Sequence, residues 1–256
     1  MLSEVDIVNK YKKFIDIIKT EFNGDRLTKI MDMVTYFEDR ITTAPASSKE
    51  FYHSSFVGGY LHHILQVYDI AMNIYMNIYY AYSQHPTFTR EELVFSVLFH
   101  DLGKLGDTEN EYYIFQTNKW RKDNLKENYT INPAIVNMEV PDRSLYILQH
   151  FGIDISQNEW IAIKIHDGMY SETNAKYFAA SHEDHVLKSM LPYIVHTADL
   201  LSSRFEYEAW RYKSQNTKNT FNIDETEFTS KKKFTSSKKT ITDVFTSETF
   251  DIDDVF

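Results

Sequence analysis

The stretch VLFHDLGKLG, residues 97–106, places His100 and Asp101 at the end of an apolar run with helical spacing. Upstream, Thr89 and Glu92 form a Thr-x-x-Glu capping box, which predicts that a helix begins there and ends at His100–Asp101. Imidazole and carboxylate groups are both good metal ligands. A core helix that ends on these two groups needs partners for them elsewhere in the chain, because buried polar groups are costly without partners.

Most of the chain up to residue 213 repeats apolar residues every three or four positions, as amphipathic helices do. The pattern predicts further helices over residues 5–22, 25–41, 59–82, 142–151, 157–166 and 184–212, with Pro192 as a candidate break in the last. Ser156 and Glu159 form a second capping box before residues 157–166. Residues 107–140 lose this period, and EYYIFQ (111–116) and NYTIN (128–132) flank a polar, basic turn. We therefore expect an all-α helical bundle with a small β-hairpin insertion near residues 111–132.

The composition indicates one domain followed by a tail. The 256 residues are 43% hydrophobic, which is enough for one sizeable core. From about Ser214 the chain is rich in Ser, Thr, Lys, Asp and Glu, with isolated Phe residues and no sustained period. Such a segment cannot bury enough apolar surface to offset its ordering entropy. We predict a helical domain over residues 1–213 and a disordered tail over residues 214–256.

Several classes of protein are disfavoured by the composition. The absence of Cys excludes disulfides, thiolate zinc sites and Cys catalysis. No apolar run approaches a membrane span and the start shows no secretion signal, so the expected location is cytoplasmic. The net charge of −10 disfavours nucleic acid as the main ligand. A small anionic substrate is still compatible, because a bound divalent cation can dominate the local field.

Histidine and aspartate residues recur at four places on the expected helices. These are His62 and His63; His100 and Asp101, with Lys104; His166 and Asp167; and His196 and Asp199, with Arg204 and Glu206. Taken singly, such residues are more often core or capping groups than ligands. Together they indicate a buried cluster that one divalent cation would satisfy. Two His and two Asp favour Mn²⁺, Fe²⁺, Co²⁺, Ni²⁺ or Zn²⁺, with Mg²⁺ less natural.

The order of these segments resembles that of the HD-domain metal-dependent phosphohydrolases, over roughly residues 50–210. GGYLHHILQV (58–67) is similar to the family's first-His segment, Gly-Gly-Leu-x-x-His-x-x-x-Val. LFHDLGK (98–104) is similar to the namesake motif, and HTADLLSSRF (196–205) to the final segment. With the first segment aligned on Val67, the resemblance implies that the metal ligands are His63, His100, Asp101 and Asp199.

The same resemblance implies one complete metal site and no complete second one. Family members with two metals carry further His residues between the HD pair and the last Asp. Here HDG (166–168) resembles their His-His-Gly, with Asp167 in place of the second His, and residues 132–140 hold no His. His150 is expected to be a helix C-cap. No role is assigned to the remaining histidines, His53, His85, His182 and His185.

The implied chemistry is hydrolysis by a metal-activated water. We expect Asp101 to orient that water or accept its proton, and His166 to act as a ligand, a general acid or a phosphate contact. Lys104 either offsets phosphate charge in the cleft or is a solvated cation at the helix C-terminus. Supporting or substrate contacts are expected from His62, Asp167, His196 and Arg204, although a plain surface role explains Arg204 equally well.

The function implied by the resemblance is a phosphohydrolase acting on (deoxy)nucleotides. The alternatives are an HD-type 3′–5′ exonuclease, a cyclic-nucleotide phosphodiesterase and a non-catalytic HD-fold binding or regulatory module. The acidic end, Phe250–Phe256, is either an ordinary solubilising segment or a short docking peptide. It resembles the acidic–aromatic C-terminal peptides by which replication proteins dock, and this resemblance implies a replication-protein partner.

Overall fold

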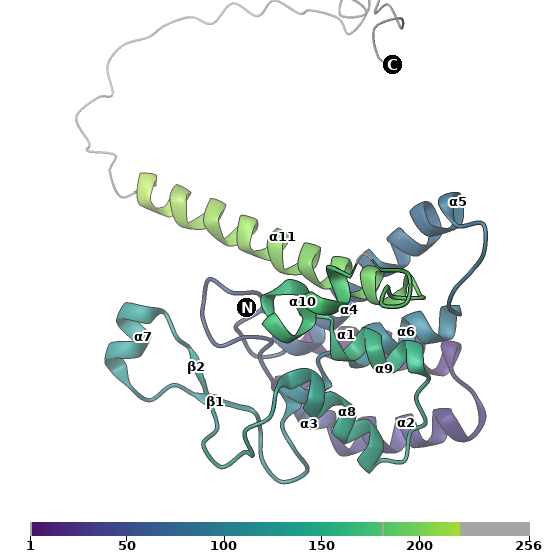
Figure 1. Ribbon diagram of the computed structural model, residues 1–256. Helices are drawn as coiled ribbons and strands as arrows, with labels where there is room; N and C mark the ends of the chain where they lie inside the picture. Colours follow the sequence, from purple (N-terminus) through teal and green to yellow (C-terminus); the bar gives the residue numbers. More distant parts are fainter. Residues whose placement is uncertain (1, 181, 221–256) are drawn as a thin grey trace, which may run out of the picture. The chain divides into compact units, whose positions relative to one another are not determined.

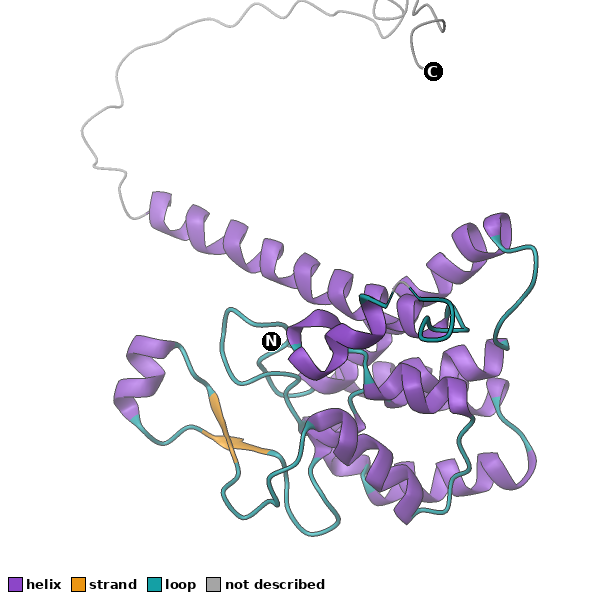
Figure 2. Cartoon of the chain, viewed as in Figure 1, coloured by secondary structure: helices purple, strands orange, loops and turns teal. Residues whose placement is uncertain are grey.

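The computed structural model describes residues 2–180 and 182–220. The chain divides into two units, residues 1–215 and 216–256. The helices are α1 (Glu4–Glu21), α2 (Gly24–Tyr36), α3 (Glu38–Thr43), α4 (Gly59–Ile74), α5 (Tyr80–Tyr82), α6 (Arg90–Phe99), α7 (Lys119–Leu125), α8 (Val140–His150), α9 (Gln157–Lys164), α10 (Glu172–Phe178) and α11 (Leu191–Thr220) (Figure 1). A π-helical segment, Tyr75–Tyr79, joins α4 to α5, and Leu102–Leu105 and Gly168–Tyr170 are 3₁₀ turns. The described chain is therefore mostly helical, as the all-α expectation predicted (Figure 2).

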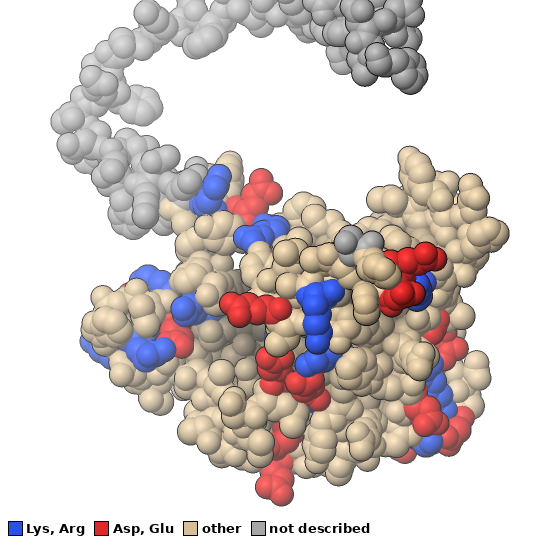
Figure 3. Space-filling model, viewed as in Figure 1, with Lys and Arg blue, Asp and Glu red and all other residues tan. Residues whose placement is uncertain are grey.

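The hairpin insertion is present and is larger than a simple turn. Strands β1 (Tyr113–Phe115) and β2 (Tyr129–Ile131) pair antiparallel, with Tyr113 opposite Ile131. Helix α7 lies in the connection between them, and the Asn118 side chain caps it by accepting the Arg121 amide at 3.2 Å. Figure 2 shows the hairpin and α7 beside the helical body, and basic side chains gather over α7 in Figure 3.

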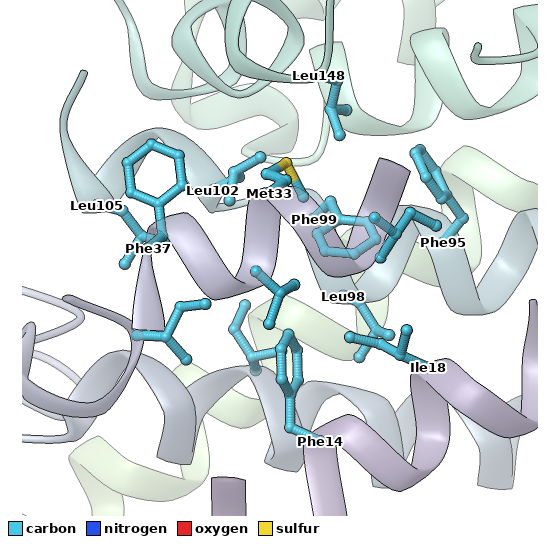
Figure 4. Packing of buried hydrophobic residues seen from close by; sticks show 14 of the residues in the cluster. Phe14, Ile18, Met33, Phe37, Phe95, Leu98, Phe99, Leu102, Leu105 and Leu148 are labelled. Carbon is cyan, nitrogen blue, oxygen red and sulfur yellow. The ribbon is translucent and has the colours of Figure 1, made fainter. Parts of the chain in front are cut away.

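Helix α6 is buried on all sides, because Leu93–Phe99 are all buried. On one side Phe99 lies in a cluster with Ile18 of α1 and with residues of α2 and α8 (Figure 4). On the other side Val97 lies in a second cluster with Val195 of α11 and with residues of α4. Each apolar side chain buried in this way contributes roughly 1.5–3 kcal/mol relative to exposure. The C-terminal end of α6 is thus fixed inside the body.

Three helices of the described chain begin at capping boxes. The pairs are Ser3–Asp6 for α1, Thr89–Glu92 for α6 and Ser156–Glu159 for α9. The last two confirm starts that the sequence predicted. Glu92 also accepts the Ser156 hydroxyl at 2.6 Å, which ties the start of α6 to the start of α9. Two helices that start together and pack side by side end close together, and each is followed by a histidine, His100 and His166.

Two boundaries of the last helix differ from the sequence expectation. Helix α11 begins at Leu191 rather than near residue 184, and Pro192 lies in its first turn, where a missing N–H breaks no helical hydrogen bond. Residues 214–220, which composition assigned to the tail, continue α11, since no Gly or Pro interrupts them. The rest of the expected tail, with Phe250–Phe256, lies outside the described residues. None of the described helices combines the length and the apolar character needed to cross a membrane.

Candidate metal centre

Five ionisable side chains from four helical segments meet at the end of α6. His63 lies on α4, His100 and Asp101 follow α6, His166 follows α9, and Asp199 lies on α11. The first four side chains are almost completely buried, whereas that of Asp199 is 18% exposed. The structure therefore brings together all four residues that the sequence proposed as metal ligands, with His166 beside them.

The Asp101 carboxylate is central to this cluster. Its Oδ2 lies 3.4 Å from His63 Nε2 and 3.5 Å from His100 Nε2, and its Oδ1 lies 3.5 Å from His166 Nε2. Asp199 Oδ1 lies 3.1 Å from His63 Nε2 and 4.0 Å from His100 Nε2. The ligand atoms of His63, His100 and Asp199 all lie within 4.8 Å of one another, which is close enough to share one cation.

Each of the three imidazole rings is held from outside by its Nδ1. His100 Nδ1 bonds the Val97 carbonyl and His166 Nδ1 the Ile163 carbonyl, both at 2.8 Å. These are carbonyls in the last turns of α6 and α9, where helices leave acceptors unsatisfied. His63 Nδ1 lies 3.3 Å from the hydroxyl of Ser202 on α11. With Nδ1 used in this way, every Nε2 points at the carboxylates, as in metal-binding histidines.

Two of these nitrogens have no hydrogen-bond partner. His63 Nε2 and His100 Nε2 are buried and make no well-aligned hydrogen bond, although His63 Nε2 lies within ion-pair distance of Asp101 and Asp199. Leaving a buried nitrogen unpaired costs on the order of 1–3 kcal/mol. A divalent cation would satisfy both nitrogens and the facing carboxylates at once. The donor set of imidazole nitrogens and carboxylate oxygens fits Mn²⁺, Fe²⁺, Co²⁺, Ni²⁺ or Zn²⁺ better than Mg²⁺.

The histidines differ in protonation. Burial lowers the pKa of His100 to about 4, so this ring is neutral at pH 7. Burial also opposes protonation of His166, but the neighbouring Asp167 and Asp101 outweigh it and raise the pKa of His166 to about 10. The pKa of His63 is raised as well, because its two carboxylate neighbours prevail over burial.

The carboxylates are held ionised by their cationic neighbours. Burial alone would raise the pKa of Asp101, but Lys104 lowers it to well below its usual value. The contact with His63 likewise lowers the pKa of Asp199 against the effect of burial. Without a metal, the negative charge is thus balanced by Lys104 and by protonated rings. A cation that binds through these rings must displace their protons.

Lys104 is part of the cluster. Its Nζ lies 2.6 Å from Asp101 Oδ2, and its side chain is only 13% exposed. The 3₁₀ turn Leu102–Leu105 that follows α6 folds the lysine back toward the ion pair. Gly103 permits the close approach of this turn to α8, since a Cβ there would lie 2.3 Å from the Val140 carbonyl oxygen. Of the two roles considered for Lys104, the solvated helix-end cation is therefore wrong.

His53 belongs to the same cluster, although the sequence assigned it no role. Its ring centre lies 4.5 Å from that of His63, and its Nε2 lies 3.3 Å from Lys104 Nζ. Burial and then Lys104 lower the pKa of His53 well below its usual value, so the ring is neutral. No signal in the linear motifs marks this residue, because it lies in a loop before α4.

The loop that carries His53 is anchored from the far end of the sequence. Glu206 on α11 accepts the Ser54 amide at 2.6 Å and the Ser54 hydroxyl at 2.7 Å. Ser54 has φ of 47°, in the left-handed region that L-residues rarely adopt. Gly59 at the start of α4 lies so close that a Cβ there would be 1.9 Å from the Ser54 carbonyl oxygen. The loop is therefore fixed between α4 and α11.

The supporting residues proposed from sequence separate into two groups. Asp167, His196 and Arg204 line a pocket beside the cluster, and His196 Nδ1 lies 2.8 Å from the His166 carbonyl oxygen. His62 lines a different pocket, next to α1, and does not join the cluster. His150 ends α8 outside the cluster. The three remaining histidines, His85, His182 and His185, are exposed.

The pocket beside the cluster has a volume of about 590 Å³. Asp199 and His53 face it, and its wall includes the aromatic rings of Tyr52, Tyr170 and Tyr207. The Arg204 guanidinium, also in the wall, donates to the Tyr170 hydroxyl. Asp199, the least buried carboxylate of the cluster, therefore faces the pocket that a ligand can enter.

No family model, no curated protein and no solved structure matches this chain.

Proposed function

We propose that this chain is an HD-type metal-dependent phosphohydrolase that hydrolyses phosphate esters of (deoxy)nucleotides. The observation that carries the proposal is the pair of buried, unpartnered nitrogens of His63 and His100, facing two ionised carboxylates beside an open pocket. The resemblance of the three sequence segments to the HD family supports the same function. A purely structural metal site would be closed on all sides, whereas Asp199 borders the pocket.

The proposed mechanism assigns a task to each residue of the cluster. His63, His100, Asp101 and Asp199 would hold the divalent cation, which supplies Lewis acidity to a phosphoryl oxygen and acidifies water. Asp101, whose pKa is held low, orients the attacking water. His166 carries a proton at neutral pH in the metal-free protein; a cation that takes its Nε2 would displace this proton, so His166 would act as a further ligand beside Asp101.

The pocket supplies groups suited to a nucleotide. Lys104 is not in the wall of this pocket; it lines a different pocket beside the hairpin, but its contact with Asp101 would let it offset the charge of the reacting phosphate. Arg204 is placed to contact a further phosphate oxygen, and a guanidinium fits such oxygens in a bidentate way. The tyrosine rings of the wall offer flat apolar surfaces against which a base can stack.

The hairpin favours a second candidate, a 3′–5′ exonuclease. Trp120 of α7 is 62% exposed and lies between Lys119 and Arg121. Exposed aromatic and basic side chains together are typical of surfaces that bind single strands. The end of the hairpin connection is joined to the pocket, because the Lys126 carbonyl accepts the amide of Glu50, next to the pocket-lining Phe51.

A substrate screen with metal analysis tests these functions together. The protein is purified without added ions, its metal content is measured, and released phosphate is followed from nucleotides, a cyclic nucleotide and a short single-stranded oligonucleotide with Mn²⁺, Co²⁺, Ni²⁺ or Mg²⁺. Hydrolysis of nucleotides is the expected result. Degradation of the oligonucleotide alone would favour the exonuclease. Bound metal without turnover of any substrate would favour the non-catalytic module.

Matched variants connect the activity to the cluster. Asp199→Asn should lose most bound metal and nearly all turnover, while the circular dichroism spectrum stays that of the wild type. Asp154→Asn, at an exposed carboxylate outside the cluster, should change neither. Undiminished metal content in Asp199→Asn would show that the ligand assignment is wrong.

We also propose that Phe250–Phe256 is a docking peptide for a replication protein, on the basis of its acidic and aromatic residues. Deletion of residues 250–256 should leave kcat on free nucleotides unchanged and abolish capture of such a partner. Loss of hydrolysis in this variant would contradict the proposal.

A further inference from the structure

The His53 ring is oriented in the same way as the three rings of the metal cluster. Lys104 Nζ lies 3.3 Å from its Nε2, and an ammonium group can only donate, so this nitrogen is the acceptor. The ring proton is therefore on Nδ1, which lies 3.3 Å from the Ser203 hydroxyl oxygen and donates to it. Its neighbour Ser202 orients His63 at the same distance. Two consecutive hydroxyls of α11 thus direct two Nε2 atoms toward Asp101.

The ammonium group of Lys104 occupies the space between two ligand-type atoms. It lies 2.6 Å from Asp101 Oδ2 and 3.3 Å from His53 Nε2. Ligand atoms of His53, His63 and Asp101 all lie within 4.8 Å of one another, so this space is bounded like a second cation position. It adjoins the first site and shares His63 and Asp101 with it, and it differs from that site in the ligand atom of His53.

The position of His53 does not depend on Lys104. The loop is fixed by Glu206, which accepts both the amide and the hydroxyl of Ser54, and by the tight approach of Gly59. The Nδ1 contact comes from Ser203, on a long helix. Replacing the lysine should therefore leave the His53 lone pair in place, facing Asp101.

We propose that His53 and Asp101 form a second divalent-cation position, which the Lys104 ammonium fills in the native protein and thereby keeps to a single ion. This inference rests on the metal site of the proposed function, but it concerns ion number and not turnover. It assigns His53 as a ligand that lies outside the linear motifs. It also assigns a role to Lys104, whose ammonium group takes the place that a divalent cation would otherwise occupy.

Mn²⁺ binding measures the number of ions directly. Isothermal titration gives the stoichiometry, and electron paramagnetic resonance detects the spin coupling of two neighbouring Mn²⁺ ions. The wild type should bind one Mn²⁺ per chain. Lys104→Met has a similar length without charge, and its thioether is a poor ligand for Mn²⁺. This variant should bind two and show the coupled signal.

The double variant tests the role of His53. His53→Ala combined with Lys104→Met should return to one Mn²⁺ and lose the coupled signal. His185→Ala combined with Lys104→Met, with the change at an exposed histidine, should retain two. Circular dichroism and thermal melting establish that each variant is folded before titration.

The outcomes separate this inference from the proposed function. One Mn²⁺ in folded Lys104→Met, or two in the His53→Ala double variant, would overturn the second position at His53. Two Mn²⁺ in the wild type would overturn the blocking role of Lys104. Each of these results leaves the first site intact. A wild type that binds no Mn²⁺ would overturn both.

Discussion

Metal binding should tighten as the pH rises, because the cation and protons compete for the same imidazole nitrogens. The pKa of His166 is raised to about 10 and the pKa of His63 is raised above its usual value. Both rings therefore carry protons in the metal-free protein at pH 6. A ring whose pKa is raised by folding stays protonated at every pH below that pKa. Proton competition with the metal is therefore strongest at the lowest pH.

The size of the effect follows from the pKa of His166. At pH 7 this ring is about three pH units below its pKa, and each unit corresponds to about 1.4 kcal/mol. Displacing the proton therefore weakens apparent metal binding by about 4 kcal/mol, or about a thousandfold. Between pH 6 and pH 8, the apparent Kd for Mn²⁺ should fall about tenfold per pH unit for each ring that loses its proton.

Calorimetric titration with Mn²⁺ at pH 6, 7 and 8 measures both the Kd and the protons released, when each titration is repeated in two buffers of different ionisation enthalpy. His166→Gln removes one competing proton, so its Kd should depend less steeply on pH and fewer protons should be released. His185→Gln, at an exposed ring, is the matched control and should behave as the wild type. A Kd that stays constant from pH 6 to pH 8, with no proton release, would refute the reasoning.

Three substitutions examine the supports of the cluster. Ser202→Ala removes the hydroxyl at His63 Nδ1 and should weaken Mn²⁺ binding about 10–100-fold by titration at fixed pH; unchanged affinity would mean that the hydroxyl does not orient the ring. Gly59→Ala places a Cβ 1.9 Å from the Ser54 carbonyl oxygen, so the loop must shift. Its melting temperature and its Mn²⁺ affinity should both fall, and a wild-type value of either would count against the fixed loop. Phe99→Ala empties a fully buried position and should lower the free energy of unfolding in urea by about 3–5 kcal/mol; a loss below about 1 kcal/mol would be incompatible with that packing.

The features that sequence predicted well are those set by local chemistry. The capping boxes at Thr89 and Ser156 fixed the starts of α6 and α9, because each box is formed within four residues. The end of α6 at His100 followed from the same apolar run. Imidazole rings that follow a helix can bond carbonyls of its last turn, as His100 and His166 both do. The convergence of these two ends could therefore be anticipated.

The features that sequence missed depend on contacts between distant segments. His53 precedes α4 by several residues and has no helical period to mark it. It joins the cluster because Glu206, 152 residues beyond Ser54, anchors the loop. The apolar pattern also predicts too early a start for α11, because it makes Pro192 a break within a helix, whereas Pro192 lies in the first turn of α11.

The cluster as a whole is an arrangement that a fold selected only for stability would not keep. Asp101, Lys104 and His166 are almost fully buried, and apolar residues of similar size often stabilise a core as well as or better than buried ions do. Two further buried nitrogens, His63 Nε2 and His100 Nε2, make no well-aligned hydrogen bond in the same place. Helices α6 and α9 and the hydroxyls of α11 nevertheless orient every ring toward the same carboxylates. Buried nitrogens that lack a hydrogen bond, and that several helices nevertheless hold in one orientation, are expected at functional sites. The missing interaction is one that a divalent cation supplies, and this links the packing of α6 to the proposed hydrolysis.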